Sequence, residues 1–351
     1  MKNPPAGIRS RFVEDVNGLR THVLEAGEAG RPAVLLLHGF PELAYSWRKV
    51  MPALAAAGFH VIAPDQRGYG ETTGWDNRYD TDLEAFRVLN LVEDAAALIA
   101  RLGLSRVHVA GHDFGSPVAG CCALLKPNLF RSVVLMSAPV GGVPVRSSHV
   151  HEELAALGRK HYQWYYSTRE ADANLSRAPA TFLRAYYHYK SADWPGNKPF
   201  PLKEWSASEL AKLPTYYVMD LDKGMAETVA PHAPANGSRW LTDAELGFYA
   251  ESYERTGFQG GLNWYRCATS PQHAAAVGAA VGGRTIDMPS MFIAGTADWG
   301  VYQKPGEFER MQKSICTDFR GAHLVPGAGH WVQQEQPERT AELLIDFLRA
   351  T

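Results

Sequence analysis

The chain has 351 residues, and its 35 Lys and Arg residues nearly balance 37 Asp and Glu residues, which gives a net charge of −2. Hydrophobic residues make up 46% of the sequence and charged residues 21%, as in an ordinary globular protein. This composition excludes a disordered or collagen-like chain. The near-neutral charge argues against nucleic acid as a partner, because binding to phosphates takes surplus positive charge. Aromatic residues are numerous, with 9 Trp, 15 Tyr and 14 Phe.

The four cysteines do not follow the pattern of a disulfide framework. Cys121 and Cys122 are adjacent, whereas Cys267 and Cys316 lie far along the chain, so we expect buried free thiols in a reducing compartment. The first residues lack the apolar stretch of a signal peptide, and no run approaches the ~18 apolar residues that span a bilayer. We expect a cytoplasmic protein with no membrane partner, as a monomer or a homodimer.

The first predicted strands, residues 11–16 and 19–26, are joined by Asn17-Gly18, a strong signal for a hairpin turn. Further strands are predicted where short, continuously apolar runs end near Gly or Pro: Ala33–Leu37, Val61–Ala63, Val107–Ala110, Ser132–Met136, Ser290–Ala294 and His323–Val325. Continuous hydrophobicity indicates burial on both faces, as in a parallel sheet covered by helices. Apolar residues between positions 91 and 102 recur at helical spacing, so strands and helices alternate as in an α/β fold.

This alternation stops between about residues 140 and 275, in a stretch rich in Tyr, Trp and Pro. Helical segments are predicted there at His161–Tyr166, Thr181–Lys190, Leu213–Asp220 and Asp243–Arg266. Because strand signals resume at Ser290, we interpret the stretch as an insertion that covers the strand ends. We therefore predict a core domain of residues 1–139 and 276–351 and a mainly helical cap domain of residues 140–275.

A candidate nucleophile follows the strand at residues 107–110, within the sequence GHDFGS at residues 111–116. The flanking glycines permit a sharp, strained turn that projects one side chain above the sheet, as in a nucleophile elbow. Here that side chain is Asp113. An Asp that precedes a helix also commonly caps the helix, so the residue alone leaves both interpretations open.

A carboxylate nucleophile forms an ester, and hydrolysis of that ester passes through an oxyanion that N–H groups must stabilise. The strand at residues 33–37 is followed by the sequence HGFPE at residues 38–42. The backbone N–H groups of Phe40 and Phe114 lie in the segments expected to supply these donors.

Hydrolysis of the ester also needs water activated by a base and a group that orients the base. His330 follows the last predicted strand in a Gly-rich loop, and Asp298 follows the strand at residues 290–294. The chain order Asp113, Asp298, His330 is the nucleophile, acid and base order of α/β-hydrolases. His330 is therefore the predicted base among the 13 histidines.

These motifs resemble those of the α/β-hydrolase-fold epoxide hydrolases over nearly the whole chain. The matching segments are HGFPE at 38–42, PDQRGYG at 64–70, GHDFG at 111–115, GTAD at 295–298 and GAGH at 327–330. In that family, two cap tyrosines hold the epoxide oxygen. The segment GFQGGLNWYR at 257–266 places one at Tyr265, and YQWYY at 162–166 places the other at Tyr162. Tyr165 or Tyr166 takes that role if the register differs.

The resemblance implies hydrolysis of an epoxide to a vicinal diol through an ester on Asp113. It implies a small apolar epoxide and water as the partners, and no metal or cofactor. Two phenols opposite the carboxylate fit this chemistry, because an alkoxide is a poor leaving group and O–H donors share its charge. The remaining side chains expected to contact substrate are His38, Pro41, Trp164 and Trp264.

Haloalkane dehalogenases resemble the same Asp–His–Asp core and are the main alternative. They usually have Trp directly after the nucleophile, where its ring N–H binds halide, and fluoroacetate dehalogenases have Arg there. This chain has Phe114, whose ring cannot donate a hydrogen bond. A catalytically silent binding protein is disfavoured because every triad position is filled. The segment at 198–240 is longer than a minimal cap requires and leaves the shape of the pocket open.

Overall fold

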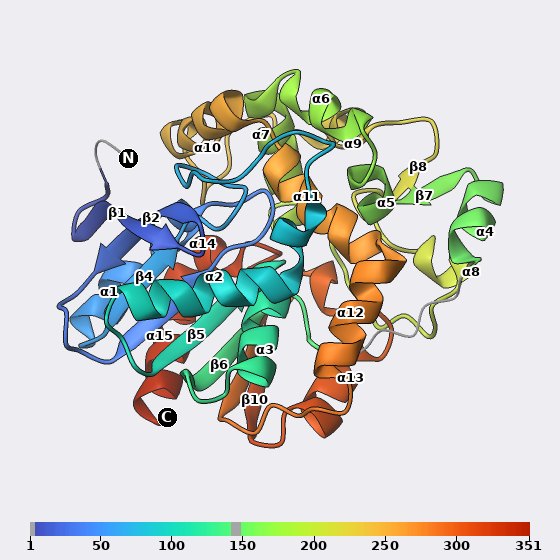
Figure 1. The fold of residues 1–351 in the computed structure, drawn as a ribbon. Helices are drawn as coiled ribbons and strands as arrows, with labels where there is room; N and C mark the ends of the chain where they lie inside the picture. Colours follow the sequence, from blue (N-terminus) through green and yellow to red (C-terminus); the bar gives the residue numbers. More distant parts are fainter. Residues whose placement is uncertain (1–3, 142–148) are drawn as a thin grey trace.

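The computed structural model describes residues 4–141 and 149–351, so residues 142–148 of the predicted cap lie outside the described part of the chain. A central eight-stranded sheet has the order β1-β2-β4-β3-β5-β6-β9-β10, and helices cover both of its faces (Figure 1). Its strands are β1 Ile8–Val16, β2 Leu19–Ala26, β3 Ala33–Leu37, β4 His60–Pro64, β5 Val107–His112, β6 Phe130–Met136, β9 Ser290–Gly295 and β10 Phe319–Val325. The predicted α/β class is confirmed.

The sheet is parallel from β4 to β10 and antiparallel at its β1–β2 edge. Asn17 and Gly18 have φ angles of 49° and 80°, so the predicted hairpin turn forms in the left-handed region that the Asn-Gly pair favours. Because the other strands run in parallel, their carboxyl ends meet at one edge, where sites of α/β proteins form.

The core helices are α1 Met51–Ala56, α2 Val88–Arg101, α3 Gly115–Leu125, α13 Glu307–Arg310, α14 Val332–Glu335 and α15 Pro337–Arg349. Two buried hydrophobic clusters flank the sheet: one lies under α2 and α3, and the other lies under α1 and α15. In β3, Leu35 and Leu37 belong to the first cluster, whereas Val34 and Leu36 belong to the second. This alternation is the burial on both faces that the continuous apolar runs predict.

Between β6 and β9 the chain forms helices that lie along the top and right of the view in Figure 1. They are α4 Val150–Ala156, α5 Tyr162–Tyr166, α6 Glu170–Ser176, α7 Pro179–Lys190, α8 Ala207–Leu210, α9 Met225–Val229, α10 Asp243–Thr256, α11 Gln259–Thr269 and α12 Pro271–Val281. A separate two-stranded sheet pairs β7 Arg159–His161 with β8 Val218–Asp220. Short turns of other helix types are η1 Ala44–Trp47, η2 Leu83–Phe86, η3 Ala230–His232, η4 Trp299–Val301 and η5 Met311–Ile315.

Two of the predicted helices differ from the structure. The segment Leu213–Asp220 is not a helix, because its last three residues pair with β7 as an antiparallel strand. The predicted helix Asp243–Arg266 is two helices, because Gly257 has a φ angle of 66° and ends α10. Both differences adjoin the segments that carry the predicted tyrosines. The strand β7, which pairs with the end of the first segment, leads directly into α5, and the break at Gly257 leads into α11.

All four cysteines are buried free thiols, as predicted. Among the described residues, every helix is too short or too polar for a membrane crossing.

Candidate active site

Asp113 stands on a strained turn between β5 and α3. Its φ angle of 52° lies in the left-handed region, and its N–H donates to the carbonyl of Met136 over 3.2 Å. A Cβ added to Gly111 would lie 2.0 Å from the Gly115 carbonyl oxygen, and one added to Gly115 would lie 2.3 Å from that of Leu37. The turn therefore requires both flanking glycines. The helix-capping interpretation of Asp113 is wrong, because the residue at the N-terminal cap of α3 is Phe114.

The two carboxylate oxygens of Asp113 have different partners. Oδ1 accepts the N–H of Phe40 over 3.0 Å, and Oδ2 lies 3.2 Å from Nε2 of His330. A Cβ on Gly39 would lie 2.4 Å from Oδ1, so a glycine is needed where the Phe40 loop meets the carboxylate. Burial alone would raise the pKa of Asp113, but the hydrogen bond and charge of His330 hold this pKa below its ordinary value. Asp113 is therefore an anion at neutral pH.

The other ring nitrogen of His330, Nδ1, also has polar partners. Nδ1 lies 3.0 Å from Oδ1 of Asp298 and 2.8 Å from Oγ of Ser137, and the N–H of Gly300 donates to the same Asp298 oxygen over 2.7 Å. Burial would raise the pKa of Asp298, but the charge of His330 lowers it below its ordinary value. These contacts fix the imidazole with Nε2 toward Asp113.

Tyr162 and Tyr265 lie close together, both in the segment between β6 and β9. Tyr162 begins α5 and Tyr265 is on α11; their ring centroids are 5.8 Å apart, and both line the cavity that contains Asp113. The Tyr162 hydroxyl donates to Oε1 of Gln303 over 3.3 Å and accepts from Nε2 of Gln163 over 3.2 Å. Burial raises the pKa of Tyr265 well above its ordinary value, so its phenol keeps its proton.

The alternative register for the first tyrosine is not favoured by the geometry. Tyr165 and Tyr166 are both buried, but neither lines the cavity that contains Asp113. The side chain of Tyr165 lies instead below the ammonium of Lys160, which is 4.8 Å from its ring centroid. Among the three tyrosines of α5, Tyr162 therefore has the position that the motif predicts.

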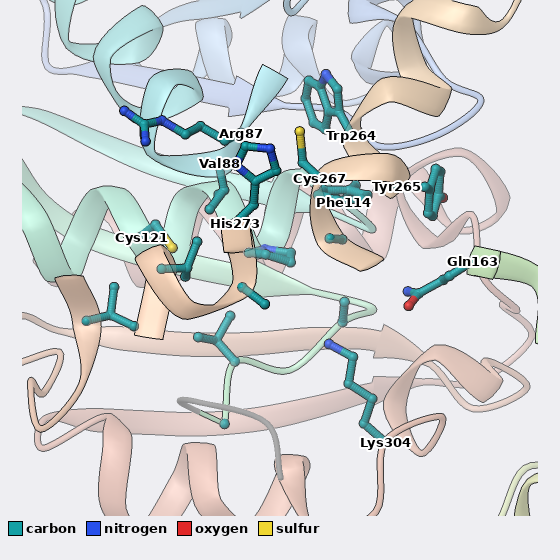
Figure 2. A pocket seen from close by; sticks show the side chains of 18 of the residues that line it. Arg87, Val88, Phe114, Cys121, Gln163, Trp264, Tyr265, Cys267, His273 and Lys304 are labelled. Atoms are coloured by element: carbon teal, nitrogen blue, oxygen red, sulfur yellow. The ribbon is translucent and has the colours of Figure 1, made fainter. Parts of the chain in front are cut away.

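The cavity has a volume of about 410 Å³. Figure 2 shows Phe114, Trp264 and Tyr265 near one another, with Gln163 and Lys304 pointing toward the same space from other segments. Phe114, the second expected oxyanion donor, follows Asp113 directly at the start of α3.

Three of the four additional contact residues that the sequence suggests do not line this cavity. Trp264 does, but His38 and Pro41 are buried elsewhere, and Trp164 lies on the surface. His38 accepts the N–H of Gln66 at Nε2 over 3.1 Å, so its ring is engaged within the core. Trp164 is 43% exposed because α5 turns only Tyr162 and its buried neighbours inward. The predicted substrate contacts of His38, Pro41 and Trp164 are therefore not supported.

Lys190 is a buried cation near the site that sequence reasoning missed. It ends α7, is 2% exposed, and its carbonyl accepts the N–H of His330 over 2.9 Å. Its ammonium lies 5.1 to 5.8 Å from the ring centroids of Tyr186, Tyr216, Tyr217 and Trp331. Burial lowers the pKa of Lys190, and the charges of Asp113 and Asp298 offset part of that effect. A lysine at a helix C-terminus usually has a solvated ammonium, so the sequence carries no signal for this environment.

His112 and Glu42 connect the turn at Asp113 to the loop that carries His330. Nδ1 of His112 donates to Oε2 of Glu42 over 2.6 Å, and its Nε2 donates to the carbonyl of His330 over 2.7 Å. Burial would lower the pKa of His112, but the charge of Glu42 raises it above its ordinary value. Gln333 and Gln334 donate to the other oxygen of Glu42. This buried network fixes the backbone at His330 to the elbow.

Glu335 supports the same loop from the other side. Its carboxyl group accepts the N–H groups of Gly329 over 3.0 Å and Trp331 over 2.9 Å, the two neighbours of His330. It also accepts the N–H of Ala192, two residues after α7, over 2.8 Å. Burial raises the pKa of Glu335 to about 7. Glu335 thus ties the loop of the base to the segment that follows α7.

The site therefore combines an anionic carboxylate, a backbone donor on it, a histidine–aspartate pair and two phenols. This set suits attack by Asp113 on an electrophilic carbon, followed by attack of activated water on the resulting ester. Within residues 4–141 and 149–351, no group of three or more His, Cys, Asp or Glu side chains is arranged to hold a metal ion.

The comparison with known proteins agrees with this geometry. The family model described as alpha/beta hydrolase fold matches residues 32–337. The chain belongs to the α/β-hydrolase fold family, and within it to the epoxide hydrolases.

Its relatives define this membership over nearly the full length. The chain is 35% identical over 347 residues to epoxide hydrolase A of Mycobacterium tuberculosis, covering 97% of this chain and 98% of the relative. A solved epoxide hydrolase from an endophytic Streptomyces superposes with a TM-score of 0.82 at 31% identity, covering 98% of this chain and 96% of the other. Epoxide hydrolase A from Mycobacterium thermoresistibile has a TM-score of 0.78 at 36% identity, covering 97% and 98%. This chain is thus a hydrolase, as the motifs predict.

Proposed function

We propose that this enzyme hydrolyses an epoxide to a vicinal diol through a covalent alkyl ester on Asp113. The observation that carries the proposal is that one cavity contains the Asp113 carboxylate and the phenols of Tyr162 and Tyr265. His330 lies against the same carboxylate, 3.2 Å from Oδ2. An epoxide in this cavity meets a nucleophile and two acids at once.

In the first step, a carboxylate oxygen of Asp113 attacks a ring carbon and the bond from that carbon to the epoxide oxygen breaks. The electron pair moves to the oxygen, which takes a proton from a phenol. Tyr162 and Tyr265 share the developing charge through O–H donors, and such donors act most strongly in a cavity that excludes water. The low pKa of Asp113 keeps the nucleophile ionised for this attack.

In the second step, His330 removes a proton from water, and the hydroxide attacks the carboxyl carbon of Asp113. The oxyanion receives the N–H of Phe40, which already contacts Oδ1, and the N–H of Phe114. Asp298 stabilises the imidazolium that forms. The diol leaves as its alkoxide takes the proton from His330, and one water oxygen stays in the carboxyl group of Asp113. The acid proton of this carboxyl group then returns to the phenolate formed in the first step, which restores the carboxylate and the phenol.

A dehalogenase would use Asp113 and His330 equally well, but it needs N–H donors for the halide. Phe114 has none in its ring. Trp264 lines the cavity, but its indole N–H donates to the carbonyl of Arg67 over 2.9 Å, away from a halide. The donors that are present, the phenols of Tyr162 and Tyr265, fit a leaving oxygen.

The test is to assay the purified enzyme with racemic 1,2-epoxyhexane and with 1-bromohexane, and to measure diol and bromide. We expect diol from the epoxide and no bromide. We expect Asp113→Ala to lose diol formation by at least 10⁴-fold at an unchanged melting temperature, because no ester can form. Bromide release without diol, or diol formation retained in Asp113→Ala, would contradict the proposal.

A further inference from the structure

The cavity that contains Asp113 extends well beyond the reacting groups, between α3 and α12 (Figure 2). The lining residues are Pro117, Cys121 and Leu124 on α3, and Ala274, Val277, Gly278 and Val281 on α12. On each helix these positions are three or four residues apart, so they form one face. At 1.5 Å per residue, the seven steps from Pro117 to Leu124 and from Ala274 to Val281 each cover about 10 Å. The two helices thus form the walls of an apolar channel of about this length.

The basic side chains that line the cavity already have carboxylate partners. Arg87 Nη1 lies 2.7 Å from Oε2 of Glu84, and Nδ1 of His273 lies 3.5 Å from the other oxygen of Glu84. Lys304 Nζ lies 3.5 Å from Oε2 of Glu307, which is buried. A carboxylate on a substrate would have to compete with these partners and lose its own hydration. The electrostatics of the channel therefore favour an uncharged substrate arm.

We propose that the preferred substrates are uncharged epoxides with an extended hydrocarbon arm, which lies between α3 and α12 while the oxirane ring meets Asp113. This inference rests on the proposed epoxide hydrolysis. An extended chain advances roughly 1.2 Å per bond, so a channel of about 10 Å holds an arm of about eight carbons. Cys121 and Val277 are intermediate lining positions on α3 and α12, so a larger side chain at either position should shorten the arm that the channel admits.

The value of kcat/KM should depend on the length of the hydrocarbon arm. Each methylene that moves from water into the channel should raise kcat/KM roughly three- to four-fold. The rise should end when the arm fills the channel, because further carbons stay in water. A terminal carboxylate should cancel the gain from several methylenes.

The experiment measures kcat/KM for 1,2-epoxyalkanes of four to fourteen carbons, and for the matching epoxides that end in a carboxylate. The variants are Val277→Phe and, from the opposite wall, Cys121→Phe, each with its melting temperature. Ala279→Phe is the matched control, because it adds the same ring to an exposed position on α12 that does not line the cavity.

For the wild type we expect a rise of at least 100-fold from four to ten carbons, then a plateau, with the carboxylated substrates at least ten-fold worse. Val277→Phe and Cys121→Phe should each lower the ratio of the ten-carbon to the four-carbon kcat/KM at least ten-fold, and Ala279→Phe should keep it. Diol formation with no dependence on chain length, a preference for the carboxylates, or an unchanged ratio in two folded wall variants would overturn the inference alone. Absence of diol from every epoxide would overturn the proposed function with it.

Discussion

Nε2 of His330 lies 3.2 Å from Oδ2 of Asp113, although 217 positions separate the two residues in the chain. In the proposed mechanism, the nitrogen that activates water is therefore occupied by the nucleophile before substrate binds. Once Asp113 becomes an ester, its carboxyl group is neutral and the electrostatic attraction to His330 is lost. Nε2 of His330 is then free to contact the water molecule. Loss of the contact with Asp113 therefore allows ester hydrolysis only after alkylation.

His330→Gln should form the ester but fail to hydrolyse it. The amide keeps part of the side-chain volume but cannot take a proton from water, so the alkyl-enzyme should accumulate. Intact-mass measurement after incubation with an epoxide should show one substrate mass added to the protein. The matched control is His323→Gln, which changes a partly exposed histidine in β10 and should show no added mass. Protein that stays unmodified in His330→Gln would count against His330 as the base.

Tyr265→Phe should slow alkylation more than ester hydrolysis, because the phenol acts on the epoxide oxygen. Loss of one of two acids should lower the alkylation rate by about 10²-fold. Rapid mixing resolves the two steps through changes in tryptophan fluorescence, to which Trp264 beside the site contributes. Tyr165→Phe serves as the control, since this tyrosine is buried and does not line the cavity. Equal slowing of both steps by Tyr265→Phe would contradict the role of this phenol.

The dependence of stability on pH should report on Glu335. Burial raises the pKa of this carboxyl group from 4.5 to about 7. The unfolded chain loses the proton near pH 4.5, whereas the folded chain keeps it until about pH 7. The contribution of Glu335 to the free energy of unfolding therefore falls as pH rises between these values. At 1.36 kcal/mol per pH unit, the fall is about 3 kcal/mol at most.

Glu335→Gln removes this titration. The free energy of unfolding of the wild type minus that of the variant should therefore decrease as pH rises from 5 to 7, measured by urea unfolding. Glu338→Gln, at an exposed position on α15, should give a difference that stays constant with pH. A constant difference for Glu335→Gln as well would show that this carboxyl group does not titrate in the range.

The proximity of Asp113, Asp298 and His330 was predictable because these residues follow short apolar runs that end near Gly or Pro. Each lies within five residues of the carboxyl end of a strand in a parallel sheet, so their proximity follows from the fold class. The positions of the residues between β6 and β9 depend instead on tertiary packing. The burial of Lys190 follows from the ring of Tyr186, one turn earlier on α7, and from three rings distant in sequence, and the exposure of Trp164 follows from the orientation of a five-residue helix. Periodicity in so short a helix does not determine which face is buried.

The same distinction applies to the fold. The hairpin at Asn17-Gly18 and the strands have strong local signals, and the structure confirms their presence. The predicted burial of His323–Val325 on both faces is wrong, because β10 is an edge strand and Leu324 is exposed. The segment Leu213–Asp220 has apolar residues that suit a helix or a strand, and its pairing with β7 decides between them. Strand pairing between segments more than fifty residues apart has no local signature.

The covalent ester on Asp113 is the central claim, and one turnover in water enriched in oxygen-18 tests it most directly. The enzyme is mixed in excess with an epoxide, digested, and the peptide that contains Asp113 is analysed by mass spectrometry. Because water attacks the carboxyl carbon of the ester, one heavy oxygen should enter the side chain of Asp113, and the diol from this turnover should carry only light oxygen. Label in the diol with none in Asp113 would show that water attacks the epoxide directly and would contradict the covalent mechanism.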